Sequence, residues 1–136
     1  MTTWDLRGTE RLVLLCNGDT CTPLGSDEIT LALRREIAAQ GLDPVVHTAR
    51  TRCLGRCEDA CTVVVQPDNV WYRNVTAEVA CAIVRQHLLT DSPVLSHVSF
   101  TAGDTGLVQV SGIRPGKPKP GSRMLVSASP ESSEIV

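Results

Sequence analysis

Long apolar stretches are missing from this chain of 136 residues, whose uninterrupted apolar runs are only a few residues long. The first ten residues, MTTWDLRGTE, are polar and charged, unlike a secretory signal. The apolar runs are also too short to cross a bilayer. We therefore expect no secretory signal, no membrane span and a cytoplasmic protein whose thiols stay reduced.

Basic tracts and nucleotide-binding signatures are missing as well. The 13 lysines and arginines are outnumbered by 15 acidic residues, which gives a formal net charge of -2. No Gly-x-Gly-x-x-Gly, phosphate-binding loop or Ser/His/Asp arrangement occurs, and His87 and His97 show no partner pattern. These absences argue against a nucleic-acid partner and against an autonomous NAD enzyme.

Cysteine, in contrast, is plentiful, with six residues in a short chain. An isolated cysteine packs as a small hydrophobe, and disulfides are uncommon in the cytoplasm. The clustering of these cysteines in loops indicates chemistry rather than packing.

The first half of the chain has the pattern of a strand-helix-strand unit. Residues 11–16, RLVLLC, are a short apolar run typical of a buried strand. A helix of about fourteen residues follows, with Ser26 as its N-cap and Gly41 after its end. A second strand is predicted over residues 44–51.

The second half has the pattern of a hairpin and a helix. The runs TVVVQ and VWY are joined by the turn PDN, which predicts two short antiparallel strands. A second helix is predicted to begin near Thr76, because apolar residues then recur at helical spacing. Its predicted buried stripe is Ala77, Cys81, Val84 and Leu88.

Together these elements predict an α/β fold: a thioredoxin-like four-stranded mixed sheet with flanking helices. This domain is predicted to span residues 1–92. The composition changes after Ser92, and residues 93–136 are predicted as a C-terminal extension, partly flexible, with alternating residues around GDTG that suit a short hairpin or an ordered arm.

Four cysteines follow the two strands of the first unit. Cys16 ends the first strand and Cys21 lies in the next loop, whereas Cys53 and Cys57 lie in the loop after the second strand. Parallel neighbouring strands send their C-terminal loops to the same edge of a sheet, where α/β proteins bind ligands. We therefore expect the four thiols to converge.

Convergent thiolates select zinc or an iron-sulfur cluster. A mononuclear zinc ion needs its sulfurs about 2.3 Å away, and its ligand pairs are closely spaced in sequence. The intervals here are four, thirty-one and three residues. A two-iron cluster is wider and takes two cysteines on each iron. The spacing favours the cluster, and a zinc-stabilised interaction module remains an alternative.

The motifs CNGDTC and CLGRCEDACTVVVQPDNVWYRNVTAEVACAIVRQHL carry a more specific resemblance. Together they are similar to the thioredoxin-like 2Fe-2S ferredoxin family, which includes single-domain ferredoxins and the small ferredoxin-like subunit of NADH-dehydrogenase and hydrogenase complexes. In that family a cysteine pair follows the first strand, a Cys-x-x-x-Cys pair follows the second, and a valine-rich strand leads through a Pro-Asp turn to a Trp-Tyr strand. The resemblance covers most of residues 11–89.

The resemblance implies an electron-transfer protein rather than an enzyme: a one-electron carrier between a reductase and an acceptor enzyme, free or as a subunit of an oxidoreductase. It also allows a homodimer. A thiol-disulfide redox protein is a further alternative, disfavoured because the sequence has no Cys-x-x-Cys pair. The implied ligands of the 2Fe-2S cluster are Cys16, Cys21, Cys53 and Cys57.

Small and basic residues surround these ligands. Gly18 and Gly55 allow the backbone to approach the sulfurs closely. Arg52 and Arg56 flank the second pair and would favour the more negative, reduced cluster.

Two cysteines are left over. Where the family has a Gly-Pro pair, this chain has Ala60 and Cys61. Cys61 is either a small residue at the start of the valine-rich strand or an alternative ligand that could replace Cys57. We favour the structural role, because a four-thiolate cluster needs no fifth thiol. Cys81 is predicted to be a core residue of the second helix.

Overall fold

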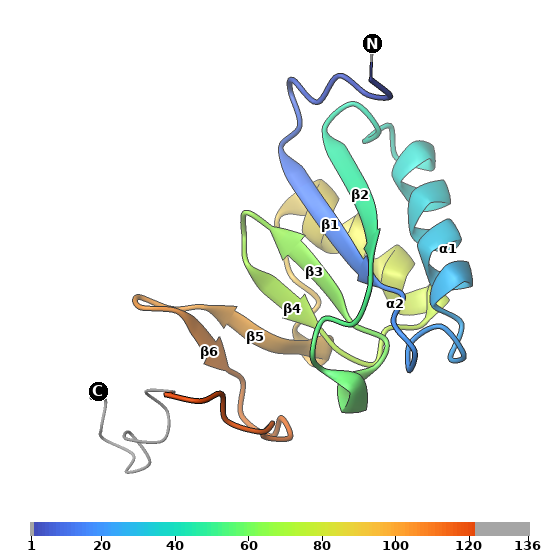
Figure 1. Cartoon of the computed structure of the whole chain (residues 1–136). Helices are drawn as coiled ribbons and strands as arrows, with labels where there is room; N and C mark the ends of the chain where they lie inside the picture. Colours follow the sequence, from blue (N-terminus) through green and yellow to red (C-terminus); the bar gives the residue numbers. More distant parts are fainter. Residues whose placement is uncertain (1, 122–136) are drawn as a thin grey trace.

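Six strands form one mixed sheet, which Figure 1 shows from one side. This computed structural model describes residues 2–121. The β1–β2 pair is parallel and the other four pairs are antiparallel. In spatial order the strands are β2 (Val46–Thr51), β1 (Arg11–Cys16), β3 (Val63–Gln66), β4 (Val70–Tyr72), β5 (Val98–Ala102) and β6 (Leu107–Gln109).

The predicted fold class is confirmed, but the predicted count of four strands is wrong. The outer edge of β4 would present unpaired N–H and C=O groups if the sheet ended there. The chain instead returns through a 3-10 turn, η3 (Leu95–His97), and lays β5 along that edge. β6 then pairs with β5 around GDTG, which confirms the hairpin alternative predicted there and extends the sheet beyond the four predicted strands.

The helix α1 (Ser26–Ala39) has the predicted length of fourteen residues. Ile29, Leu33 and Ile37 are buried, as expected for the inner face of an amphipathic helix. The predicted N-cap is wrong: Gly25, with φ 96°, precedes the helix, and the Ser26 hydroxyl donates to Asn17 Oδ1 at 2.9 Å. The start of α1 is thereby tied to the loop after β1.

The second helix begins as predicted, with the Thr76 hydroxyl accepting from the amide of Val79 at 3.2 Å. It runs as α2 (Ala77–Ala82) and continues as the π-helical segment η2 (Ile83–Leu88). α2 packs against α1.

The predicted buried stripe of this helix is only partly right. Val84 and Leu88 are buried, whereas Ala77 is exposed and Cys81 is half-buried. The observed buried stripe is shifted by about one residue from the predicted stripe. The reason is that it includes His87, a polar residue that a search for apolar positions leaves out. Its members are Ala80, Ile83, Val84, His87 and Leu88.

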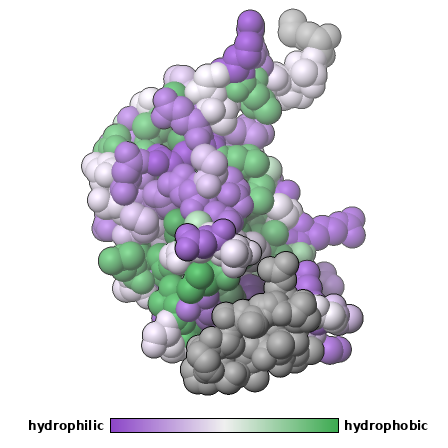
Figure 2. Space-filling view, turned by 90° about the vertical axis from the view of Figure 1, so that its left-hand side faces the viewer, coloured by the Kyte–Doolittle hydropathy of each residue, from purple (hydrophilic) through white to green (hydrophobic). Residues whose placement is uncertain are grey.

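The surface is mixed in polarity. Seen from the left of Figure 1, hydrophobic patches are separated by a broad hydrophilic area (Figure 2). Large hydrophobic side chains that are exposed include Trp4, Leu24, Leu95 and Val108. Scattered exposed apolar residues of this kind are ordinary on a protein surface.

Two expectations concern the chain as a whole. None of the helices within residues 2–121 is both long and apolar enough to cross a bilayer. The predicted boundary after Ser92 stays a prediction, and residues 122–136 of the predicted extension lie outside the described part of the chain.

Candidate metal centre

β1 and β2 end side by side, since Cys16 is the register partner of Thr51. The loops that follow them are joined by the amide of Asn17, which donates to the carbonyl of Thr51 at 2.8 Å. A small pocket between these loops is lined by Cys16, Gly18, Thr20, Cys21, Cys53, Arg56 and Cys57. The structure thus brings together the four cysteines that the sequence singles out.

Gly18 fixes how closely the two loops approach. A Cβ atom at this position would lie 2.8 Å from both the Cα and the backbone nitrogen of Cys53, which is closer than real side chains come to a backbone. Glycine is therefore needed for this contact between the two loops.

The four thiols divide into a buried pair and an exposed pair. Cys16 and Cys21 are 4% and 2% exposed, whereas Cys53 and Cys57 lie at the surface. The sulfurs of Cys53 and Cys57 are 3.5 Å apart. The amide of Gly55 donates to the Cys53 sulfur at 3.2 Å, so the backbone already offers a hydrogen bond to a negative sulfur.

Two buried thiols of this region, those of Cys21 and Cys61, are resistant to ionisation on their own. Burial raises the pKa of the Cys21 thiol to about 12, with a contribution from the neighbouring Cys16 thiol and an opposing hydrogen bond from Thr62. Burial also raises the pKa of the Cys61 thiol. A metal ion deprotonates a coordinating thiol outright. This half of the pocket therefore suits thiolates when metal charge compensates them.

Comparison with known proteins decides the family. The chain is 49% identical over 88 residues to a Priestia megaterium protein named "Putative 2Fe-2S ferredoxin", covering 65% of this chain and 68% of that protein. The chain belongs to the 2Fe-2S ferredoxin family. It is also 37% identical over 68 residues to a 2Fe-2S ferredoxin of Clostridium pasteurianum, covering 50% of this chain and 67% of that protein. No family model matches the sequence.

Solved structures agree with this assignment. A thioredoxin-like 2Fe-2S ferredoxin from Aquifex aeolicus superposes with a TM-score of 0.67 at 28% identity, covering 74% of this chain and 99% of that chain. A second structure, of the wild-type protein from the same organism, gives a TM-score of 0.62 at 29% identity, covering 66% of this chain and 96% of that chain. The predicted thioredoxin-like ferredoxin fold and 2Fe-2S cofactor are confirmed.

The donor set of this ferredoxin fits a two-iron cluster. Within residues 2–121, no group of three or more Cys, His, Asp or Glu side chains is arranged to hold a single metal ion. A 2Fe-2S cluster makes a different demand, because each iron takes only two cysteines. The pocket offers its thiols as two such pairs. Cys16 and Cys21 form one pair, and Cys53 and Cys57 form the other.

Arg56 is the charged side chain that lines the cysteine pocket of this ferredoxin. Its Nε donates to Asp59 Oδ2 at 2.6 Å, and its Nη2 donates to the carbonyl of Arg114 at 2.7 Å. Its guanidinium also lies 5.0 Å from the centre of the Phe100 ring, in a cation–π contact. The position of this cation is thus fixed by three separate partners.

The two remaining cysteines occupy different environments. Cys61 is 3% exposed, and its thiol donates to the carbonyl of Cys21 at 3.5 Å. It lies beside the buried thiol pair but does not line the pocket. Cys81 is half-buried on α2 and is also absent from the pocket lining.

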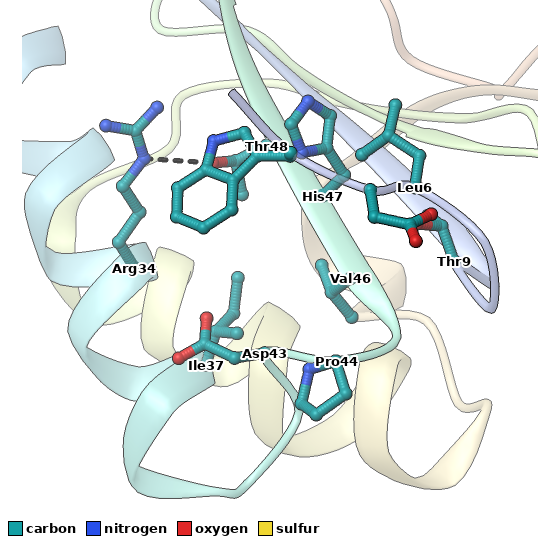
Figure 3. Close-up of a pocket in the computed structure, with 11 residues that line it drawn as sticks. Leu6, Thr9, Arg34, Ile37, Asp43, Pro44, Val46, His47 and Thr48 are labelled. Atoms are coloured by element: carbon teal, nitrogen blue, oxygen red, sulfur yellow. Dashed lines mark hydrogen bonds between the residues drawn. The ribbon is translucent and has the colours of Figure 1, made fainter. Parts of the chain in front are cut away.

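A separate pocket of this ferredoxin, lined without any cysteine, lies between α1, β2 and the N-terminal segment (Figure 3). Arg34 on α1 donates to the hydroxyl of Thr48 at 2.8 Å, and His47 of β2 is among the lining residues. His47 therefore contributes to this pocket, and the cysteine pocket has no histidine in its lining.

Sequence reasoning missed a buried polar network around His87. This side chain is 1% exposed, with Nδ1 at 2.8 Å from the Tyr72 hydroxyl and Nε2 at 2.7 Å from Asp68 Oδ2. The Tyr72 hydroxyl also accepts from the amide of Val94 at 3.0 Å, and Asp68 accepts from Arg11 at 3.1 Å. The sequence gives little indication of this network, because the residues that contact one another in it are far apart along the chain. The network is structural and contains none of the proposed ligands.

Proposed function

We propose that this ferredoxin carries single electrons between a reductase and an acceptor enzyme, with its cluster bound by the four pocket cysteines. The observation that carries the proposal is the convergence of four thiols from two loops in one pocket. The proposed ligands are Cys16, Cys21, Cys53 and Cys57.

The two thiol pairs have different tasks in this proposal. Cys16 and Cys21 hold the cluster against the core and exclude water from it. Cys53 and Cys57 lie at the surface, so electrons enter and leave on their side. The cluster itself, when bound, supplies a reversible one-electron change.

Residues around the exposed pair favour the added electron. The Gly55 amide donates to the Cys53 sulfur, and the Arg56 guanidinium, whose charge is partly offset by Asp59, lies at the pocket wall. Hydrogen bonds to sulfur and nearby positive charge both stabilise a more negative cluster. We also place the protein in the cytoplasm, where free thiols are kept reduced until metal is inserted.

Metal analysis of anaerobically purified full-length protein tests the proposal. We expect two irons and two acid-labile sulfides per chain, visible absorption bands and an electron paramagnetic resonance signal after one-electron reduction. Zinc without colour, or a metal-free disulfide, would overturn the proposal in favour of an interaction module or a thiol-disulfide protein.

A further inference from the structure

Residues 111–121, here called the basic arm, contain three basic residues spaced along the segment. The segment SGIRPGKPKPG contains Arg114, Lys117 and Lys119 and no acidic residue. Its two lysines are the only lysines in the entire chain. Lys117 and Lys119 each precede a proline, which favours extended backbone at both lysines.

The basic arm is fixed to the loop of residues 52–62 between β2 and β3, here called the second cysteine loop. Ile113 is 6% exposed and anchors the arm in the core. The carbonyl of Arg114 accepts from Arg56 at 2.7 Å, and the Arg114 guanidinium donates to Glu58 at 3.0 Å. Figure 1 shows the orange-red chain after β6 passing beside the green loop that holds these partners.

The lysines follow directly after this contact. A Cβ atom on Gly116 would lie 3.0 Å from Arg56 Nη1, so the arm is packed closely on the side chain that lines the cysteine pocket. Lys117 is the next residue, and both Lys117 and Lys119 are exposed. Neither lysine takes part in an ion pair within residues 2–121.

Acidic groups on the second cysteine loop do not cancel the positive charge of Lys117 and Lys119. Glu58 is paired with Arg114, which belongs to the arm itself. Asp59 is 5% exposed and paired with Arg56 at 2.6 Å. These four charged groups therefore pair with one another, whereas the two lysines of the arm have no ion-pair partner among the described residues.

The remaining charges at this edge nearly balance. Asp19 in the first cysteine loop is exposed, and exposed Arg52 directly precedes Cys53 in the second loop. The cluster bound by four thiolates is itself negative. An acidic protein approaching the cluster would be repelled by that charge unless cations beside it supply attraction.

We propose that the basic arm is a docking surface for the acidic face of a redox partner protein. This inference rests on the proposed function, since it takes the cluster to be the electron donor. Attraction between the lysines and partner carboxylates would steer the partner to the cluster edge and raise the rate of encounter.

Electron transfer to two acceptor proteins of opposite charge tests the inference. Full-length protein is reduced with dithionite, and its oxidation is followed in stopped flow with rubredoxin, an acidic acceptor, or cytochrome c, a basic one. In each reaction one electron leaves the cluster and converts one acceptor Fe(III) to Fe(II). For rubredoxin we expect a second-order rate constant that falls as ionic strength rises.

The K117E/K119E variant should lower the rate constant with rubredoxin about tenfold at low ionic strength and raise that with cytochrome c. K117Q/K119Q should show a smaller change in the same directions. The matched control is R7E/R35E, which reverses two exposed arginines on the N-terminal segment and on α1. It should leave both rate constants within about twofold of the parent.

Opposite movement of the two rate constants distinguishes docking from a changed reduction potential, which would move both in the same direction. Equal rate constants for parent and K117E/K119E protein, with the cluster loaded in both, would overturn the docking role alone. Purified parent protein without iron and sulfide would overturn the proposed function and the docking role together.

Discussion

At the scale of single residues, the two thiol pairs of the cysteine pocket differ in their exposure to solvent. Cys16 and Cys21 are nearly inaccessible, whereas Cys53 and Cys57 meet solvent. In the proposed cluster site, removal of Cys53 or Cys57 would leave one iron short of a protein ligand. Removal of the buried neighbour Cys61 leaves the proposed ligand set complete.

The first prediction compares these two kinds of cysteine. C57A should lose most of its iron and visible absorption, because one iron would keep a single protein ligand from the second loop. C61A should keep the cluster and lose roughly 1 kcal/mol of unfolding free energy, since it removes a buried sulfur. Iron content and absorption are measured for both. Loss of the cluster in C61A would make Cys61 a ligand and contradict its structural role.

Tyr72 supports a second prediction. Y72F leaves His87 and the amide of Val94 without their hydroxyl partner in the core. The unfolding free energy should fall by about 1–3 kcal/mol, as for other unsatisfied buried polar groups. The control is T62V, because the buried hydroxyl of Thr62 has no hydrogen-bond partner among the described residues. Urea titration should find T62V unchanged or more stable than the parent.

Asp68 gives the stability a pH dependence. Burial opposes its ionisation, but hydrogen bonds from His87 and Arg11 outweigh burial and hold the pKa of Asp68 below its ordinary value. A carboxylate with a lowered native pKa stabilises the fold above its unfolded pKa of about 3.9, and this contribution is lost as the pH falls through the native value.

The D68N variant tests the direction of this pH dependence of stability. It should be less stable than the parent at neutral pH, and the difference should shrink as the pH is lowered from about 5 to about 3. Urea midpoints of both proteins, together with an exposed-site control, D104N, are compared at each pH. A difference that grows as the pH falls would contradict the assigned cause.

At the scale of elements, the meeting of the two cysteine loops depends on Gly18. G18A should push the loops apart and lower the iron content per chain several-fold, because its Cβ would overlap the backbone of Cys53. G103A is the control: a Cβ there would crowd Val108 and Gly106 in the β5–β6 hairpin, away from the thiols. If G103A loses as much iron as G18A, general destabilisation rather than loop separation is the cause.

Local patterns predicted those elements whose signals lie within a few residues. The bounds of β1, the length of α1 and the β3–β4 hairpin follow from apolar runs and turn residues. The convergence of the four cysteines was also predictable, because the loops that follow two neighbouring parallel strands lie at the same edge of the sheet.

Other features depend on contacts between distant parts of the chain. The burial of His87 is set by Tyr72 and Asp68, which lie 15 and 19 residues away. The pairing of β5 depends on the free edge of β4. The anchoring of the basic arm depends on Arg56, 58 residues before its acceptor at Arg114. No local pattern encodes these contacts.

At the scale of the whole molecule, residues beyond the predicted boundary belong to the same sheet as the thioredoxin-like part. Val98 and Ser99 are buried, and the amide of Val94 donates to Tyr72. A chain of residues 1–92 should therefore melt at a lower temperature than one of residues 1–121, because it exposes the edge of β4. Equal melting temperatures in calorimetry would support a domain that ends at residue 92.

The restriction of lysine to the basic arm also has a practical consequence. Apart from the N-terminal amine, any amine-reactive surface would capture this ferredoxin through Lys117 or Lys119. Covalent attachment to a carboxylate-coated electrode would therefore hold the basic arm, which packs on Arg56 of the cysteine pocket, against the conductor in molecules bound through a lysine. The immobilised film would have a preferred orientation, set by two side chains, without any engineered tag.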